Sequence, residues 1–153
     1  MNIIIEGPDG AGKTTLANQL AEALNLHVMH FSAPLNDNSQ FNMYREVLLS
    51  KRNTILDRAW YSDMVYGPIF RGRPEITKEL MWELERCAED TIVVFCTGPV
   101  EAMWEAALRR GETFVKNFGQ YKRICAAYQE IMCWQYHEIP VHIREATWLT
   151  KEN

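Results

Sequence analysis

A glycine-rich segment near the start of the chain has the residue types and spacing of a polyphosphate-binding loop. Residues 7–15 read GPDGAGKTT, which matches the pattern G-x-x-x-x-G-K-[ST] in full. Glycines let the backbone turn with its N–H groups facing inward, and the helix that follows adds the positive end of its dipole. These features predict a cradle for a nucleoside triphosphate, formed by Gly7, Asp9, Gly10, Ala11, Gly12, Lys13, Thr14 and Thr15.

Separate side chains of this loop have separate expected tasks. Lys13 is expected to reach the β- and γ-phosphates, and the hydroxyl of Thr14 is expected to bind Mg²⁺. Thr15 belongs to the first turn of the following helix. The loop therefore predicts ATP and Mg²⁺ as cofactors.

A second pair of reactive side chains lies further along the chain. Asp57 is the last residue of a short expected strand over residues 54–57, and Arg58 follows it, at the carboxyl end where parallel sheets carry their chemistry. The carboxylate can hold Mg²⁺ through water or accept the proton of an acceptor hydroxyl, and the guanidinium can bind a phosphate with two hydrogen bonds. The pair favours a kinase over a generic nucleotide hydrolase.

The elements that must position these residues alternate between strand and helix. Apolar runs predict strands, and apolar residues at helical spacing predict helices. The segment 67–74 is rich in Gly and Pro and is expected to be a surface loop. The expected strands are 2–6, 27–31, 54–57, 91–97 and 141–144, and the expected helices are 13–25, 37–50, 75–89, 100–110 and 118–136.

This alternation predicts an α/β fold with a parallel sheet. We expect the P-loop nucleoside triphosphate hydrolase fold, with a five-stranded sheet in the order 2-3-1-4-5 and helices on both faces. The 153 residues, 47% of them hydrophobic, suit one domain over residues 1–153, with a lid at about 109–118.

Composition limits the classes of partner. The net charge of −4 gives no general electrostatic reason for binding DNA or an acidic membrane. The apolar stretches are far shorter than the roughly 20 residues of a membrane span, so we expect a cytoplasmic protein. The cysteines at 87, 96, 125 and 133 show no metal-ligand spacing and are expected to be reduced core thiols.

Several motifs together resemble the thymidylate kinase family. Residues 55–66 read ILDRAWYSDMVY and are similar to the Asp-Arg segment of that family, and the opening EGPDGAGKTT looks like its phosphate loop. The Arg-Arg-Gly at 109–111 is similar to the family's lid entry, and residues 118–128 resemble the helix after the lid. The resemblance implies phosphoryl transfer from Mg-ATP to a deoxynucleoside monophosphate, most simply a pyrimidine such as dTMP.

The resemblance also implies roles for individual residues. Asp9 would approach the acceptor sugar, and Asp57 and Arg58 would flank the attacked phosphate. Tyr66 would lie against the deoxyribose and Arg71 near the acceptor, while Arg109, Arg110 or both would close over the ATP phosphates. A homodimer is one oligomeric state that such an enzyme adopts, and the sequence leaves the oligomeric state open.

The chain departs from the family at the acceptor side. Ala59 and Gly67 replace family residues, and the region after the second expected strand lacks the family's REPGG segment. Asp63 is a candidate base-binding residue, because its carboxylate can accept a hydrogen bond from a hydroxymethyl group or an exocyclic amine.

Two other readings stay open. A kinase acting on a nucleoside, or on a hydroxymethylated pyrimidine within DNA, is favoured by Asp63 and the shortened monophosphate region, although nucleic acid would require several phosphate contacts from Lys and Arg. A nucleotide-binding switch or hydrolase with a protein partner would need a water-positioning residue and a base-selecting motif, and neither is evident.

Overall fold

The computed structural model describes residues 1–31, 39–50, 53–111, 115 and 117–146. Its five strands form one fully parallel sheet in the order β2-β3-β1-β4-β5, which confirms the predicted topology. The strands are β1 (Asn2–Glu6), β2 (His27–His30), β3 (Thr54–Asp57), β4 (Thr91–Thr97) and β5 (Val141–Glu145). The helices are α1 (Lys13–Leu24), α2 (Ser39–Ser50), α3 (Trp60–Phe70), α4 (Lys78–Cys87), α5 (Val100–Arg110) and α6 (Phe118–Met132).

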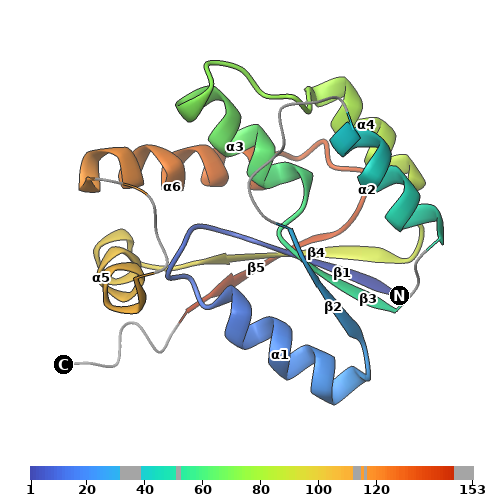
Figure 1. Cartoon of the computed structure of the whole chain (residues 1–153), viewed down its shortest axis with the longest axis horizontal. Coiled ribbons are helices and arrows are strands. Elements are labelled where there is room, and N and C mark those ends of the chain that lie inside the picture. The colour runs from blue at the N-terminus through green and yellow to red at the C-terminus, as the bar shows by residue number, and fades with distance from the viewer. Residues whose placement is uncertain (32–38, 51–52, 112–114, 116, 147–153) are drawn as a thin grey trace.

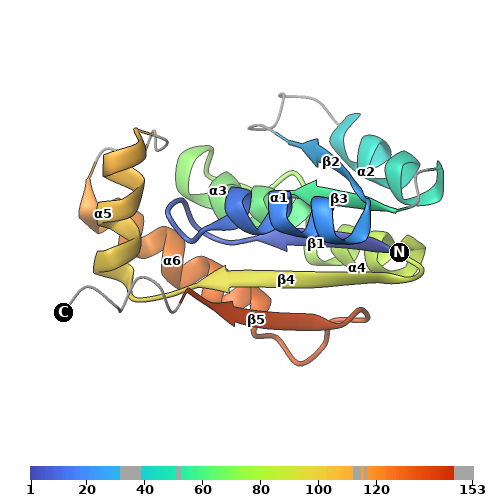
Figure 2. The same cartoon turned by 90° about the horizontal axis from the view of Figure 1, so that it is seen from below.

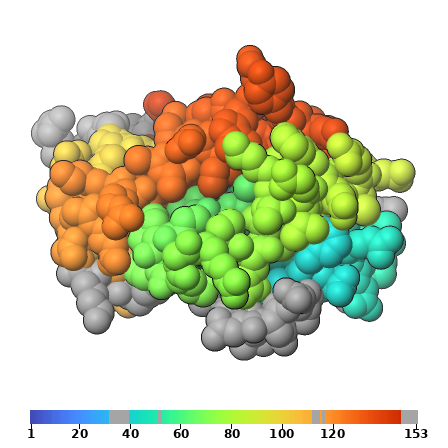
Figure 3. Space-filling view, turned by 90° about the horizontal axis from the view of Figure 1, so that it is seen from above, coloured from blue at the N-terminus to red at the C-terminus, as the bar shows by residue number. Residues whose placement is uncertain are grey.

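Helices lie on both faces of the sheet, as predicted. Helix α1 covers one face, while α2, α3, α4 and α6 lie on the other, and α5 stands beyond the carboxyl end of β4 (Figures 1 and 2). Figure 3 looks onto the second face, where α6, α3, α4 and α2 follow one another across the surface. In this arrangement the carboxyl ends of β1 and β3 lie beside the turn that leads into α1.

The central strand shows why its sequence lacks polar alternation. Ile3, Ile4 and Ile5 of β1 are at most 2% exposed, because helices cover β1 from both faces. Leu16 and Ala17 of α1 pack into the same core, whereas Leu24 is 49% exposed at the end of its helix.

The prediction of a surface loop over 67–74 is wrong in its first half. Helix α3 continues through Gly67 and Pro68 to Phe70. Proline removes its own N–H and crowds the carbonyl four residues earlier, but Pro68 lies in the last turn of α3, where the Arg71 N–H still donates to the Gly67 carbonyl at 2.8 Å. A Cβ on Gly67 would lie 2.7 Å from the Arg73 carbonyl oxygen, so this glycine serves close packing.

Other boundaries moved by a few residues. Helix α5 ends at Arg110, as expected, and Gly111 caps it with a φ of 64°. Helix α4 begins at residue 78, where the Thr77 side chain accepts from the Leu80 N–H, and α6 ends at residue 132 rather than 136. The expected core thiols are buried only at Cys96 and Cys125, because Cys133 is exposed and Cys87 half-buried.

Candidate active site

The predicted phosphate loop joins β1 to α1, and its glycines have the required conformations. Gly7, Gly10 and Gly12 have φ values of 146°, 83° and 83°. A Cβ on Gly7 would lie 2.2 Å from the Cys96 carbonyl oxygen, so only glycine fits there. The turn is thereby held against the end of β4.

Lys13 lies over this turn as a buried cation. It is 7% exposed, and its Nζ donates to the Pro8 carbonyl at 2.8 Å. Burial, with a further contribution from nearby Arg58, lowers the pKa of Lys13 to about 8. A polyanion bound at this point would offset that cost, so the loop fits the phosphates of ATP.

The structure brings the two predicted reactive groups into one pocket. Asp57 lies opposite Ile5 in the register of β3 and β1, so both strands end at the same edge of the sheet as the loop. A pocket of about 80 Å³ is lined by Asp9, Gly10, Gly12, Lys13, Thr14, Asp57, Arg58 and Arg110. Main-chain amides and cations thus face a carboxylate across a small polar space.

Arg58 has an unusual backbone that turns its side chain into this pocket. Its φ is 69°, a region that residues other than glycine rarely adopt, and its N–H donates to the Ile5 carbonyl at 2.9 Å. The guanidinium pairs with the Asp9 carboxylate and donates to the Tyr128 hydroxyl at 3.1 Å. It also lies 5.6 Å from the centre of the Tyr66 ring.

Asp63 and Arg71 form an ion pair with each other. Asp63 is 1% exposed, and it accepts hydrogen bonds from the backbone N–H groups of Glu75 and Ile76 at 3.0 and 2.9 Å in addition to its pair with Arg71. These contacts hold the segment between α3 and α4, and they occupy the carboxylate that the sequence offered to a base.

The lid residues divide between the described and the undescribed parts. Arg110 lines the phosphate-loop pocket, whereas Arg109, the residue before it on α5, does not. Outside the lid, Thr15 of the predicted phosphate cradle is exposed in the first turn of α1. Residues 112–114 and 116 of the predicted lid lie outside the described residues, so the lid stays a prediction.

Sequence reasoning missed several residues that contact the predicted site. The His30 Nδ1 lies 2.9 Å from Asp57 Oδ2, a contact that the sequence analysis does not predict. The signal was available, because His30 ends the strand beside β3 and lies in register with Asp57. Tyr121 and Tyr128 are buried in α6, and their hydroxyls bond the Asp9 carbonyl and Arg58.

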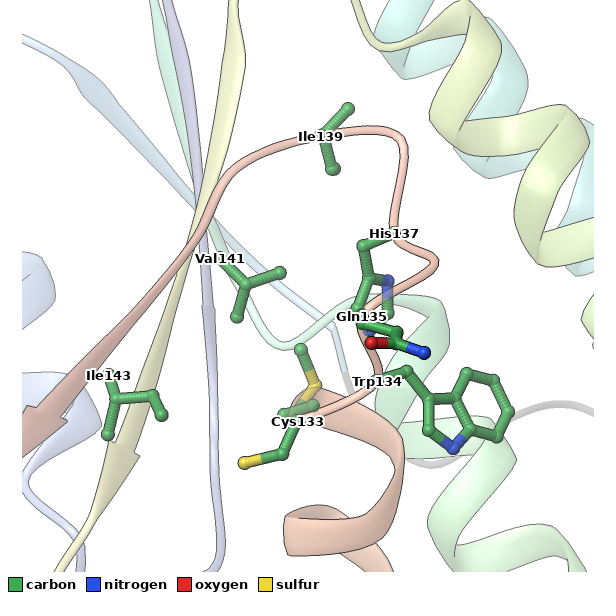
Figure 4. Close-up of a pocket in the computed structure, with 8 residues that line it drawn as sticks. Cys133, Trp134, Gln135, His137, Ile139, Val141 and Ile143 are labelled. Atoms are coloured by element: carbon green, nitrogen blue, oxygen red, sulfur yellow. The ribbon is translucent and has the colours of Figure 1, made fainter.

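A different pocket lies at the edge of the sheet, away from these residues. It encloses about 360 Å³ between β5 and the segment that follows α6, and Figure 4 shows the side chains that line it. Its walls are mixed, with polar and apolar side chains side by side, and no predicted site residue lines it. The lining residues are Met132, Cys133, Trp134, Gln135, His137, Ile139, Val141 and Ile143.

Neither a membrane span nor a protein-only metal cluster is found in the part of the chain that the structure describes. Its helices are too short or too polar to cross a bilayer. Nowhere among these residues do three or more His, Cys, Asp or Glu side chains gather as ligands for a metal ion.

One family model matches the first strands and the phosphate loop. The model of the "ATPase family associated with various cellular activities (AAA)" matches residues 3–59, which include the phosphate loop, Asp57 and Arg58. No curated protein matches the chain in sequence. With the strand order, this match defines the P-loop nucleoside triphosphatase fold.

Solved structures share this fold over nearly the whole chain. The YorR protein of Bacillus subtilis, in complex with phosphorylated GDP, is similar with a TM-score of 0.82 and 21% identity, covering 95% of this chain and 85% of that one. A deoxyadenosine kinase from M. mycoides with bound dCTP gives 0.65 and 18%, covering 96% and 91%. A gluconokinase from Sinorhizobium meliloti 1021 gives 0.61 and 14%, covering 94% and 81%.

Proposed function

We propose that the chain is a kinase that moves the γ-phosphate of Mg-ATP to a deoxynucleoside monophosphate, with a pyrimidine such as dTMP as the first candidate. The observation that carries this proposal is the shared pocket of Lys13, Asp57 and Arg58. A carboxylate at the opposite wall also serves a P-loop hydrolase, where it helps to hold Mg²⁺, so Asp57 alone does not separate the two classes. Arg58 beside it gives the pocket a guanidinium that can bind the second phosphate of an acceptor presented for attack.

Positioning and charge stabilisation account for the chemistry. Phosphoryl transfer leaves little covalent work to the protein, so its rate depends on in-line placement and on cations near the transferring group. Lys13 and Arg110 would neutralise the phosphates of ATP, and Arg58 would hold the acceptor. Thr14 and Asp57 supply the oxygen ligands that suit Mg²⁺, which would neutralise charge on the β- and γ-phosphates.

A further pocket, between α2 and α4, suits the acceptor base. It encloses about 270 Å³, with apolar walls from Phe41, Ile76 and Leu80. Gln40 is 7% exposed, and its Oε1 and the buried Oε2 of Glu75 have no hydrogen-bond partner among the residues that the structure describes. Buried acceptors without partners favour a ligand that carries N–H donors, as pyrimidine bases do on their imide or amine edge.

The relatives support a nucleotide acceptor without fixing its type. The deoxyadenosine kinase is a protein with bound dCTP or dATP, and YorR was obtained with phosphorylated GDP. A nucleoside acceptor is the second candidate. The Asp63–Arg71 ion pair favours it, because Arg71 is then less available to an acceptor phosphate.

Transfer from γ-labelled ATP tests the proposal. The purified chain is incubated with water alone, with each deoxynucleoside, with each monophosphate and with oligonucleotides that carry hydroxymethylated pyrimidines. Label in a deoxynucleoside diphosphate supports the first candidate, and label in a monophosphate supports the second. Release of inorganic phosphate alone, with every acceptor unlabelled, would contradict both and favour a hydrolase or switch.

A further inference from the structure

Glu6 is a fully buried acid at the end of β1, directly before the phosphate loop. It is 0% exposed, and its carboxylate reaches across to the start of α3. Its Oε2 accepts from the Ala59 N–H at 3.2 Å and from the Ser62 N–H at 2.8 Å, and its Oε1 lies 2.5 Å from the Ser62 hydroxyl. Burial of a charged carboxylate costs free energy even when several donors contact it, which indicates a specific role for Glu6.

The first purpose of Glu6 is to cap α3 from another strand. Helix α3 begins at Trp60, and its N-cap residue, Ala59, has no side-chain group that could accept a hydrogen bond. The N–H groups of the first turn need acceptors, and a negative charge there also suits the helix dipole. Glu6 supplies both to the helix whose start follows Arg58.

The second purpose is to complete a directed chain of hydrogen bonds. A guanidinium can only donate, so Arg58 donates to the Tyr128 hydroxyl at 3.1 Å. An ionised carboxylate can only accept, so the Ser62 hydroxyl donates to Glu6. Arg58 also donates to the Ser62 hydroxyl at 3.4 Å, and the 2.8 Å contact between Tyr128 and Ser62 must then carry the Tyr128 hydrogen towards Ser62.

Protonation of Glu6 would reverse this chain. A carboxylic acid that donates to Ser62 turns the Ser62 hydrogen towards Tyr128, which then loses Ser62 as its acceptor. The acid also becomes a poorer acceptor for the two backbone N–H groups of α3. Both changes loosen the segment that carries the left-handed Arg58.

The surroundings of Glu6 shift its protonation towards neutral pH. Burial raises the pKa of Glu6 to about 7, against hydrogen bonds from Ser62 and the charge of Arg58, which lower it. The charged or titratable groups that influence or are influenced by its charge come from α2, the β3–α3 segment, α3 and α6. They are Tyr44, Arg58, Tyr61 and Tyr128.

We propose that Glu6 is a positioning residue that fixes Arg58 for the acceptor phosphate, and that acceptor binding and transfer require its ionised form. This inference rests on the proposed kinase function. It adds a residue that touches neither substrate and a dependence on pH that the reacting groups alone do not demand.

The pH profile of kcat/KM for dTMP, or for whichever acceptor the panel identifies, tests this role. We expect the wild-type profile to fall on the acid side with a midpoint near pH 7. Glu6→Gln keeps the size and one carbonyl acceptor but cannot ionise. It should lower kcat/KM by about tenfold at pH 8. The acid side of its pH profile should then show only the titration of the acceptor phosphate, whose second pKa is about 6.

Two readouts separate positioning from general damage. The KM for ATP should change by less than about twofold in Glu6→Gln, because the loop amides and Lys13 are untouched. Glu85→Gln is the matched control, since Glu85 is also a buried carboxylate that contacts a hydroxyl and a backbone N–H, yet lies on α4 outside the pocket. It should keep the wild-type pH profile.

A second variant keeps the test decisive if Glu6→Gln does not fold. Ser62→Ala removes the middle of the hydrogen-bond chain and should flatten the same limb, whereas Ser50→Ala, which removes a bond to the Glu46 carbonyl, should not. Coincident profiles for wild type and the Glu6 or Ser62 variants would overturn the role of Glu6 alone. A wild-type chain that phosphorylates no acceptor would instead defeat the kinase proposal.

Discussion

Two buried carboxylates, Glu6 and Glu85, show how the same chemical group can serve different ends in one fold. Glu6 connects through Ser62 and Tyr128 to Arg58, whose guanidinium lines the phosphate-loop pocket. Glu85 accepts from the Tyr61 hydroxyl at 3.3 Å, from His137 Nδ1 at 3.1 Å and from the Glu138 N–H at 3.0 Å. Its contacts lie away from the phosphate-loop pocket, and His137 among them lines the separate pocket beside β5.

The difference lies in where each network terminates. His137 is held on both sides, because its Nε2 lies 2.7 Å from the Ile131 carbonyl oxygen while Nδ1 faces Glu85. Both ring nitrogens then donate, which requires the charged form. The Glu85 clamp is therefore closed and ties α3, α4 and the segment after α6 together, whereas the Glu6 network is open to the pocket and acts on a group that can meet substrate.

The largest expected effect is functional and comes from the pocket end. Lys13→Ala should reduce transfer by at least about 10³-fold, because it removes the cation over the transferring phosphate. Its melting temperature should be unchanged or higher, since burial of Lys13 is unfavourable and lowers its pKa to about 8. Kinetics and thermal unfolding of one preparation check both, and a folded variant with near wild-type turnover would contradict the assigned role.

The opposite pattern is expected at the closed clamp. Glu85→Ala leaves His137 as an unpaired buried cation and should lower the free energy of unfolding by about 3 to 5 kcal/mol. The folded fraction should keep kcat/KM within about twofold of wild type. Urea unfolding and assays at low temperature separate the two quantities. A loss of activity without a loss of stability would break the distinction between the regions.

A smaller effect concerns the pH dependence of stability. Burial alone would lower the pKa of His137, but the hydrogen bonds to Glu85 and the Ile131 carbonyl and the charge of Glu85 raise it. Its contribution is therefore fully present below the unfolded pKa of about 6.5 and is lost as the pH rises through the higher folded value. The melting-temperature gap between wild type and His137→Gln should shrink by about 2 to 4 °C from acid to alkaline pH. A constant gap would show that His137 does not gain its proton on folding.

The smallest expected effect comes from His30, which contacts Asp57 but is 63% exposed. His30→Ala removes one hydrogen bond from the carboxylate and should lower kcat by about threefold to tenfold, with little change in stability. His142→Ala, on exposed β5, provides the comparison. Equal kinetics for the two variants would exclude His30 from the working site.

The sequence predicted the parts of this molecule that depend on local pattern. The apolar run of β1, the loop glycines and Asp57 at a strand end each follow from residue type and spacing, and the strand order was confirmed. The prediction of a loop over 67–74 failed because Pro68 is tolerated near the end of α3, where Gly67 packs closely against the chain that follows. No local sequence pattern predicts such a packing contact.

The contacts that join distant segments were beyond reach for the same reason. Glu6 and Ser62 are 56 residues apart, and Arg58 and Tyr128 are 70 apart, so only the folded sheet brings them together. The helical spacing of Tyr128 matches a buried stripe of α6, and its side chain is 0% exposed. Its hydroxyl nevertheless has a partner in the pocket, which spacing cannot show.

The most direct test of the central claim is transfer by Asp57→Asn. The account predicts that this variant binds ATP with an affinity close to that of wild type, because the loop and Lys13 are intact, while transfer of labelled phosphate to the acceptor is lost. Equilibrium binding and transfer are measured on the same folded sample. Retained transfer at wild-type rate would contradict the claim that the carboxylate facing the phosphate loop takes part in the reaction.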